Sequence, residues 1–373
     1  MFRAIARIQF RLATYWTCCG SQTRAPGARL CEAQQPWLLV WSEIILGNRY
    51  SIWTNRLLIL VAAAGAGCVH DQVRRDPAVI AEATALRFLQ REVPSWSREN
   101  GCFSCHNNGD AARALYAATQ KGYRIAPNVL ADTTAWVAQP GRWDHNKGDP
   151  GFSDKRLANI QFAAALLAAW EAGHVKNSQP LQEAARKAAA DQEADGAWHI
   201  EPQNPIGSPA TYGTTLATFM ALKTLLRANL PEASDAIRKA RDWLQRTSAD
   251  NMLTTSILLL DASGSGFHLH PASSIEQNIA AIRRAQTSDG GWGPYPDSPP
   301  EAFDTAVALL ALAEARTRPG VDGLIHRGRS FLAAQQNADG SWPASTRPAG
   351  GASYAQRVST TAWALLALLS TRQ

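Results

Sequence analysis

Two cysteines and a histidine form the segment of this sequence with the clearest chemistry of its own. They occur as Cys102-Phe103-Ser104-Cys105-His106. Two thiols at this spacing can form thioether bonds to the vinyl groups of a haem, and the adjacent imidazole can ligate the iron. The segment therefore predicts a covalently bound c-type haem, haem c, attached at Cys102 and Cys105, with His106 as the proximal iron ligand.

Other interpretations of the same residues stay open. Cys102 and Cys105 could instead form a disulfide or redox pair, and the three side chains could be half of a zinc site or a chance arrangement. His145, in Trp143-Asp144-His145-Asn146, is the candidate for the sixth iron ligand. An exposed loop histidine and an open sixth position are the alternatives there.

The basic charge of the chain is concentrated ahead of residue 68. Residues 1–67 hold seven arginines against two acidic residues, although the whole chain has 37 basic and 31 acidic residues. The remainder is therefore close to neutral, with 30 basic against 29 acidic residues. A body with this balance shows no electrostatic footprint for nucleic acid, so we expect no nucleic-acid partner.

The end of this leader resembles a secretion signal. Arg56 precedes an apolar run at 57–64, and three small residues at 65–67 precede Cys68. The run is too short to span a bilayer. We expect a bacterial lipoprotein, exported to the periplasm and anchored to the membrane by a lipid on Cys68; an ordinary cleaved signal is the alternative. Residues 1–67 then form the leader, with a start codon assigned too far upstream, and 68–78 form a linker.

A repeat organises residues 79–373. Gln192 to Trp198, Gln286 to Trp292 and Gln336 to Trp342 share one spacing and an internal Asp-Gly, and Gln90 to Trp96 keeps the spacing alone. Asp-Gly supplies the turn after a helix, because glycine permits positive φ. The tryptophan can pack on a neighbouring hairpin, and the glutamine amide can bind loop backbone groups.

Each repeat pairs a helix with one charged side and a second, nearly apolar helix, which suit an outer and an inner layer. The predicted outer and inner spans are 79–92 and 110–121, 127–139 and 155–172, 178–193 and 213–228, 234–247 and 252–261, 274–286 and 302–316, and 322–337 and 356–371. This order predicts an all-α fold, an (α/α)6 toroid of six helical hairpins, with the Cys-x-x-Cys-His loop at 97–109. An open helical solenoid is the alternative.

The segment 327–342, with Gln336, Gly340 and Trp342, resembles the QW repeat of squalene-hopene cyclases and their prenyltransferase relatives. That resemblance implies an α/α toroid with an apolar or isoprenoid ligand in its central cavity. It also implies a catalytic carboxylate in a D-x-D-D motif. The matching stretch is 301–306, in which Phe303 replaces the central acid and Asp304 remains. Asp304 is therefore the catalytic candidate, and a first-turn acid favoured by the helix dipole is its alternative.

The sequence as a whole favours an exported squalene-cyclase-like toroid that carries haem c, with a role in electron transfer, redox sensing or ligand binding and with a redox partner. By register, the haem would face the mouth of the central cavity. Two alternatives remain: a terpenoid cyclase or prenyltransferase-like enzyme with a degenerate acid motif, and a non-catalytic scaffold with a Cys102–Cys105 disulfide.

Overall fold

The structure is a computed structural model that describes residues 76–147, 154–200, 206–263, 272–345, 347 and 352–372. Residues 72–373 form one compact unit, which is described here by itself. The leader, Cys68 with its expected lipidation, and most of the linker lie outside the described residues. In the part of the chain that is described, no helix has the length and apolar character needed to cross a membrane.

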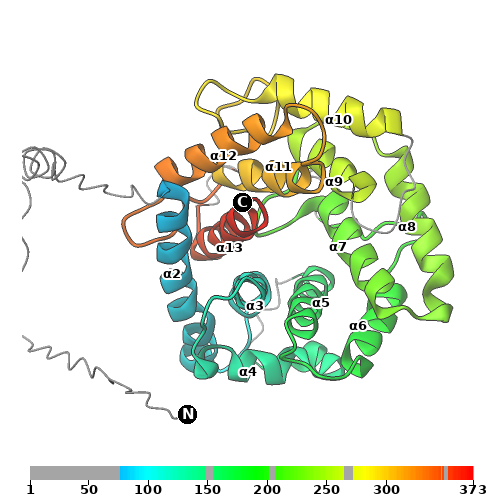
Figure 1. Ribbon diagram of the computed structural model, residues 1–373. Helices are drawn as coiled ribbons and strands as arrows, with labels where there is room; N and C mark the ends of the chain where they lie inside the picture. Colours follow the sequence, from blue (N-terminus) through cyan, green and yellow to red (C-terminus); the bar gives the residue numbers. More distant parts are fainter. Residues whose placement is uncertain are drawn as a thin grey trace, which may run out of the picture. The chain divides into compact units, whose positions relative to one another are not determined.

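Twelve α-helices within the described residues form six consecutive hairpins around a common centre (Figure 1). The outer helices are α2 (Pro77–Asn100), α4 (Pro127–Val137), α6 (Gln179–Ala190), α8 (Ser234–Arg246), α10 (Ala272–Ala285) and α12 (Val321–Gln335). The inner helices are α3 (Ala112–Gln120), α5 (Lys155–Glu171), α7 (Gly213–Ala228), α9 (Met252–Ser263), α11 (Ala302–Glu314) and α13 (Tyr354–Ser370). The predicted all-α (α/α)6 toroid is confirmed.

Side-chain composition explains the two layers. Ten of the thirteen residues of α11 are buried, whereas only two of the thirteen in α8 are, and the exposed side of α8 is charged. A helix that is apolar on nearly all faces is stable only when other helices surround it. The inner ring therefore holds the core, and the outer helices face solvent on one side.

The ring closes between the last and first hairpins. Gln336 Nε2 donates to the carbonyl of Ala81 in α2 at 2.9 Å and to the carbonyl of Gly340 in its own loop at 3.0 Å. Thr84 of α2 donates its hydroxyl hydrogen to Gln336 Oε1 at 2.6 Å. An open solenoid would leave these residues far apart, so the contacts exclude that alternative.

The other two Gln-to-Trp segments hold neighbouring hairpins in the same way. Gln192 bonds the carbonyls of Gly196 and Ala236, and Gln286 bonds those of Gly290 and Leu324, at 2.8–3.0 Å. In all three segments the buried indole N–H donates to a carbonyl ten residues earlier at 2.7–2.8 Å. The three segments are therefore equivalent clamps between successive outer helices.

The fourth segment does not form such a clamp. Gln90 and Trp96 both lie inside α2, and Gln90 Nε2 bonds the Leu86 carbonyl of the same helix. No Asp-Gly follows Gln90, so no left-handed residue ends the helix there. The helix instead continues to Asn100 and ends at Gly101, whose φ is +65°.

The predicted loop at 97–109 is correspondingly too long. After Gly101, a π-helix begins at Cys105 and runs to Ala111, where it joins α3. The Ser104 side chain caps this helix by accepting from the backbone N–H groups of His106 and Asn107. Cys105 and His106 thus lie in the first turn of an inner helix, and Cys102 lies in the turn before it.

The contact at ring closure predicts that alanine at two glycines will lower the unfolding free energy by unequal amounts. Gly340 has φ +91°, and a Cβ there would lie 2.4 Å from the Thr84 carbonyl oxygen of α2. Gly122 has a similar φ of +84°, with no atom within 4 Å of such a Cβ. Gly340→Ala should lower the unfolding free energy by roughly 3–5 kcal/mol, and Gly122→Ala by about 1–2 kcal/mol from backbone strain alone. Equal losses in urea unfolding followed by circular dichroism would contradict a stabilising contact at ring closure.

Candidate functional site

The inner ring contains cavities at its two ends. The central cavity, of about 230 Å³, is lined by side chains from all six inner helices and continues into a wider mouth of about 510 Å³ at their C-terminal ends. A third cavity, of about 540 Å³, lies near the N-terminal ends of α5 and α13 and is lined by Cys102, Cys105 and His106. We call it the Cys-His pocket.

The Cys-His pocket brings together the three residues that the sequence singles out. Five aromatic side chains contribute to its walls: Trp96, Phe103, Trp143, Phe162 and Tyr354. The rings of Trp96 and Tyr354 stack at 5.9 Å, which joins the first hairpin to the last. The pocket therefore offers an apolar space bounded on one side by two sulfur atoms and an imidazole.

Cys102 is a buried free thiol in this structure. Its sulfur accepts a hydrogen bond from the Trp96 indole N–H at 3.4 Å. The alternative Cys102–Cys105 disulfide is therefore not formed. No group of three or more His, Cys, Asp or Glu side chains in the described part of the chain is arranged to hold a metal ion.

The tautomer of His106 follows from its hydrogen bonds. Ser359 in α13 donates its hydroxyl hydrogen to Asp110 Oδ2 at 2.8 Å, and its oxygen lies 3.1 Å from His106 Nδ1. Because that hydroxyl has only one hydrogen, its oxygen accepts from Nδ1–H, and Nε2 keeps a lone pair. Burial lowers the pKa of His106, and the nearby Asp110 carboxylate opposes the shift. A neutral imidazole held in this way is suited to ligate a metal.

Asp110, in the π-helix before α3, is a buried carboxylate that joins several hairpins. Besides Ser359, its carboxylate accepts hydrogen bonds from Gln161 Nε2 of α5 at 2.8 Å and from the Tyr212 hydroxyl. Burial and the Asp110 charge raise the pKa of Tyr212 well above its usual value, so this phenol stays a donor. Tyr212 has a strained φ of +60° just before α7, and such strain is typical of functional sites.

The structure does not bring His145 to this pocket. His145 is exposed at the end of the 3-10 helix η2 (Pro140–His145), and the pocket is lined instead by its neighbours Trp143 and Asn146. The Asn146 side chain bonds the N–H and the carbonyl of Phe103 at 3.0 and 2.7 Å. Asn146 therefore positions the cysteine-containing turn, a role that its sequence context did not suggest.

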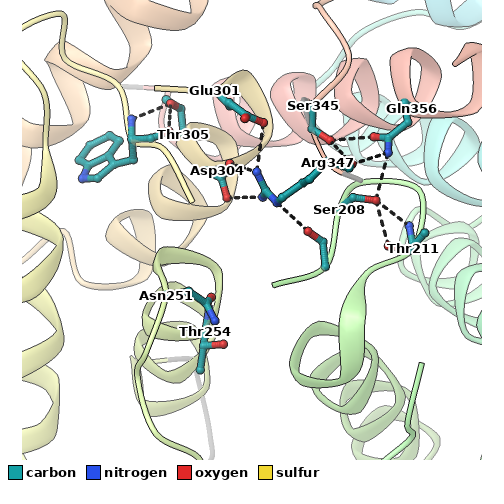
Figure 2. A network of polar contacts seen from close by, with 12 residues as sticks. Ser208, Thr211, Asn251, Thr254, Glu301, Asp304, Thr305, Ser345, Arg347 and Gln356 are labelled. Carbon is teal, nitrogen blue, oxygen red and sulfur yellow. Dashed lines mark hydrogen bonds and ion pairs between the residues drawn. The ribbon is translucent and has the colours of Figure 1, made fainter. Parts of the chain in front are cut away.

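Asp304 is held in a buried ion pair (Figure 2). Arg347 Nη1 and Nη2 donate to its two carboxylate oxygens at 2.9 and 2.6 Å. Arg347 also contacts Glu301 at 3.1 Å and donates from Nε to the Gly207 carbonyl at 2.8 Å. Burial raises the pKa of Asp304 to about 6, and Arg347 opposes that rise. Arg347 is 43 residues from Asp304 in an irregular loop, so no sequence pattern could have identified it as the partner.

The neighbour of Asp304 packs against a side chain that lines the central cavity. Phe303 is fully buried and meets Trp363 edge-on, with ring centroids 5.8 Å apart. Trp363 lines the central cavity, whereas neither Asp304 nor Asp110 does. An aromatic side chain therefore occupies the position of the central acid in the D-x-D-D pattern, and the remaining carboxylate faces Arg347.

No known protein-family model matches this sequence. This chain is 27% identical to the drimenyl diphosphate synthase of Streptomyces showdoensis over an alignment of 192 residues that covers 44% of this chain. The chain spans about a third, 35%, of that curated relative's length.

Two structures of the type II terpene cyclase MstE from Scytonema superpose with a TM-score of 0.50. One is the apo enzyme, at 18% identity over 79% of this chain and 97% of that one. The other is a variant in complex with geranylgeranyl dihydroxybenzoate, at 17% identity over 79% and 98%. The fold is terpene cyclase-like. The Cys-His pocket and the Asp304–Arg347 ion pair follow from this chain's own residues and not from these comparisons.

The ion pair predicts a structural effect for Asp304→Asn. The substitution removes the carboxylate that bonds both Nη1 and Nη2 of Arg347 and leaves Glu301 as the remaining charge partner, so the unfolding free energy should fall by about 3 kcal/mol in urea denaturation. Asp235→Asn on α8 is the matched control, because its ion pairs with Arg238 and Lys239 are solvent exposed, and it should stay close to wild type. Unchanged stability together with a lost reaction would instead assign Asp304 to catalysis.

Proposed function

We propose that this chain is a terpene cyclase-like protein that binds a linear isoprenoid in its central cavity. The observation that carries the proposal is that all six inner helices line this cavity and contribute apolar side chains to its wall. Its wall includes Leu216, Phe219, Leu310, Trp363 and Leu366. Burial of methyl and methylene groups against such a surface supplies binding free energy in proportion to the apolar area removed from water.

The comparisons support an isoprenoid as the apolar ligand. The curated relative is named for a drimenyl diphosphate, and an MstE structure holds a geranylgeranyl compound. A terpene cyclase-like fold does not by itself determine the reaction, because function depends on the site and not on the fold.

Protonation of the ligand by Asp304 has no geometric support in this chain. Both oxygens of Asp304 bond to Arg347, and Asp304 does not line the central cavity. We therefore propose ligand binding without Asp304-dependent cyclisation. The alternative is a cyclase that uses another acid, and product analysis distinguishes the two.

A second candidate function rests on the Cys-His pocket. We propose that Cys102 and Cys105 attach a haem c there, with His106 Nε2 as the iron ligand. The apolar walls, the volume of about 540 Å³ and the tautomer set by Ser359 and Asp110 fit such a group. A bound haem supplies one-electron redox chemistry, which implies a redox partner. In a bacterium, haem attachment would take place after export. Export and a lipid anchor at Cys68 are therefore part of this proposal.

If an isoprenoid binds in the central cavity, a larger side chain in the cavity wall should weaken its binding. Ala168 is partly buried and lines the central cavity, so Ala168→Trp should occupy ligand space and weaken geranylgeraniol binding by about tenfold or more, measured by quenching of tryptophan fluorescence. Ile80→Trp is the control, because Ile80 is 50% exposed on α2. If the two variants bind alike, the ligand does not occupy this cavity. Gas chromatography with mass detection of the same mixtures should show no cyclised product.

Haem attachment predicts a covalent chromophore. Protein produced with the cytochrome c maturation machinery should show a Soret band that remains with the polypeptide after denaturation. The double variant Cys102→Ala/Cys105→Ala should lose it, while Asn146→Ala should retain covalent haem, because Asn146 contacts the turn only through hydrogen bonds. Absence of covalent haem in the wild-type protein would refute this second function and leave isoprenoid binding untouched.

A further inference from the structure

An arginine lies at the blind end of the central cavity. Arg113 on α3 follows Asp110 by three residues, lines this cavity and is 7% exposed. Its guanidinium lies over the Trp363 ring, with Cζ 4.1 Å from the ring centroid. The face of the Trp363 ring attracts the Arg113 cation. This cation–π contact is weaker than an ion pair with a carboxylate.

The guanidinium N–H groups of Arg113 lack strong hydrogen-bond acceptors among the described residues. Nη1 reaches only the Met220 sulfur at 3.7 Å, and a thioether is a weak acceptor. Nη2 is 4.0 Å from Asp110 Oδ1, beyond hydrogen-bond distance. Nε and Nη2 are buried without a hydrogen-bond partner among the described residues. A buried guanidinium normally has carboxylate or carbonyl acceptors, because burying its charge without them is costly.

Asp110 cannot turn fully to Arg113. Its two oxygens already accept from Ser359, Gln161 and Tyr212, three donors from other hairpins. These bonds hold both oxygens in place, and Oδ1 stays 4.0 Å from Arg113 Nη2. Arg113 is thus left as a cation at the cavity end for which the protein itself provides no strong acceptor.

We propose that the ligand of the central cavity is an acidic amphiphile, a long-chain carboxylate bound head-inward with its carboxylate on Arg113. The inference rests on the proposed function, because it assumes that the cavity holds an apolar chain. A planar guanidinium matches a carboxylate in two parallel hydrogen bonds, and displacement of the weak Met220 contact frees Nη1 for this purpose. The apolar wall then encloses the chain, and the chain end points to the mouth.

The charges at the mouth favour the same orientation. Glu171, Asp261 and Glu314 line the mouth, and Arg227 there is already paired with Glu171 at 2.8 Å. An anionic head group at the mouth would meet these carboxylates, whereas at the blind end it meets Arg113. Lys223 lines both the mouth and the cavity, so it is the cation that would hold the head group in the opposite orientation.

Binding of matched acids and alcohols tests this inference. We expect geranylgeranoic acid to bind the wild-type protein at least about tenfold more tightly than geranylgeraniol near neutral pH, by isothermal titration calorimetry. Arg113→Met should abolish that preference and keep alcohol binding, which also reports that the variant is folded. Arg113→Lys, which keeps the charge but not the planar fork, should keep part of the preference. Lys223→Met, the matched control at the mouth, should keep all of it.

The outcomes separate this inference from the proposed function. Equal binding of acid and alcohol to the wild type would overturn the carboxylate site and leave isoprenoid binding intact, whereas failure of both to bind would overturn the proposed function. Loss of the preference in Lys223→Met, but not in Arg113→Met, would place the head group at the mouth and refute the inference. Palmitate distinguishes the source: binding tighter than that of geranylgeranoic acid supports the carboxylate site and assigns it to fatty acids.

Discussion

The buried carboxylate of Asp110 is the interaction on which the inner ring depends most. Its three donors come from α5, from the turn before α7 and from α13, so four of the six hairpins meet at one charged group. Ser359 is 249 residues away in sequence and reaches Asp110 only because the ring is closed. A buried carboxylate requires such donors, because an unsatisfied one would cost far more than each bond contributes.

The same carboxylate separates the two candidate sites. Toward the N-terminal ends of the inner helices, Ser359 links it to His106 and the Cys-His pocket. Toward the C-terminal ends, Arg113 lies 4.0 Å away at the blind end of the central cavity. Tyr212 has a strained backbone with positive φ, and its hydroxyl bonds to Asp110. Such strain persists only where surrounding contacts hold the residue, and this hydrogen bond is one of them. A terpene cyclase-like toroid thus contains two separate spaces with one shared polar centre.

The acid of the D-x-D-D pattern has a structural position in this chain. Asp304 and Arg347 satisfy each other at 2.6 and 2.9 Å, and Phe303 packs on Trp363 where the pattern has its central carboxylate. Ser345, Gln356 and Ser208 extend the same network around Arg347 (Figure 2). At this position the chain has a packed, ion-paired part of its core, and a terpene cyclase-like fold does not by itself determine the chemistry of a site.

The sequence by itself determined the hairpins, since each helix is encoded by contiguous residues: apolar periodicity, and an Asp-Gly turn in front of Trp198, Trp292 and Trp342. Where that local signal was incomplete, after Gln90, the predicted loop at 97–109 was too long because the helix had nothing to end it before Gly101. Only the tertiary structure decided which side chains share a site. His106 meets Ser359 and Asp304 meets Arg347, while His145 stays exposed, because ring closure and loop paths place residues that no spacing along the chain relates.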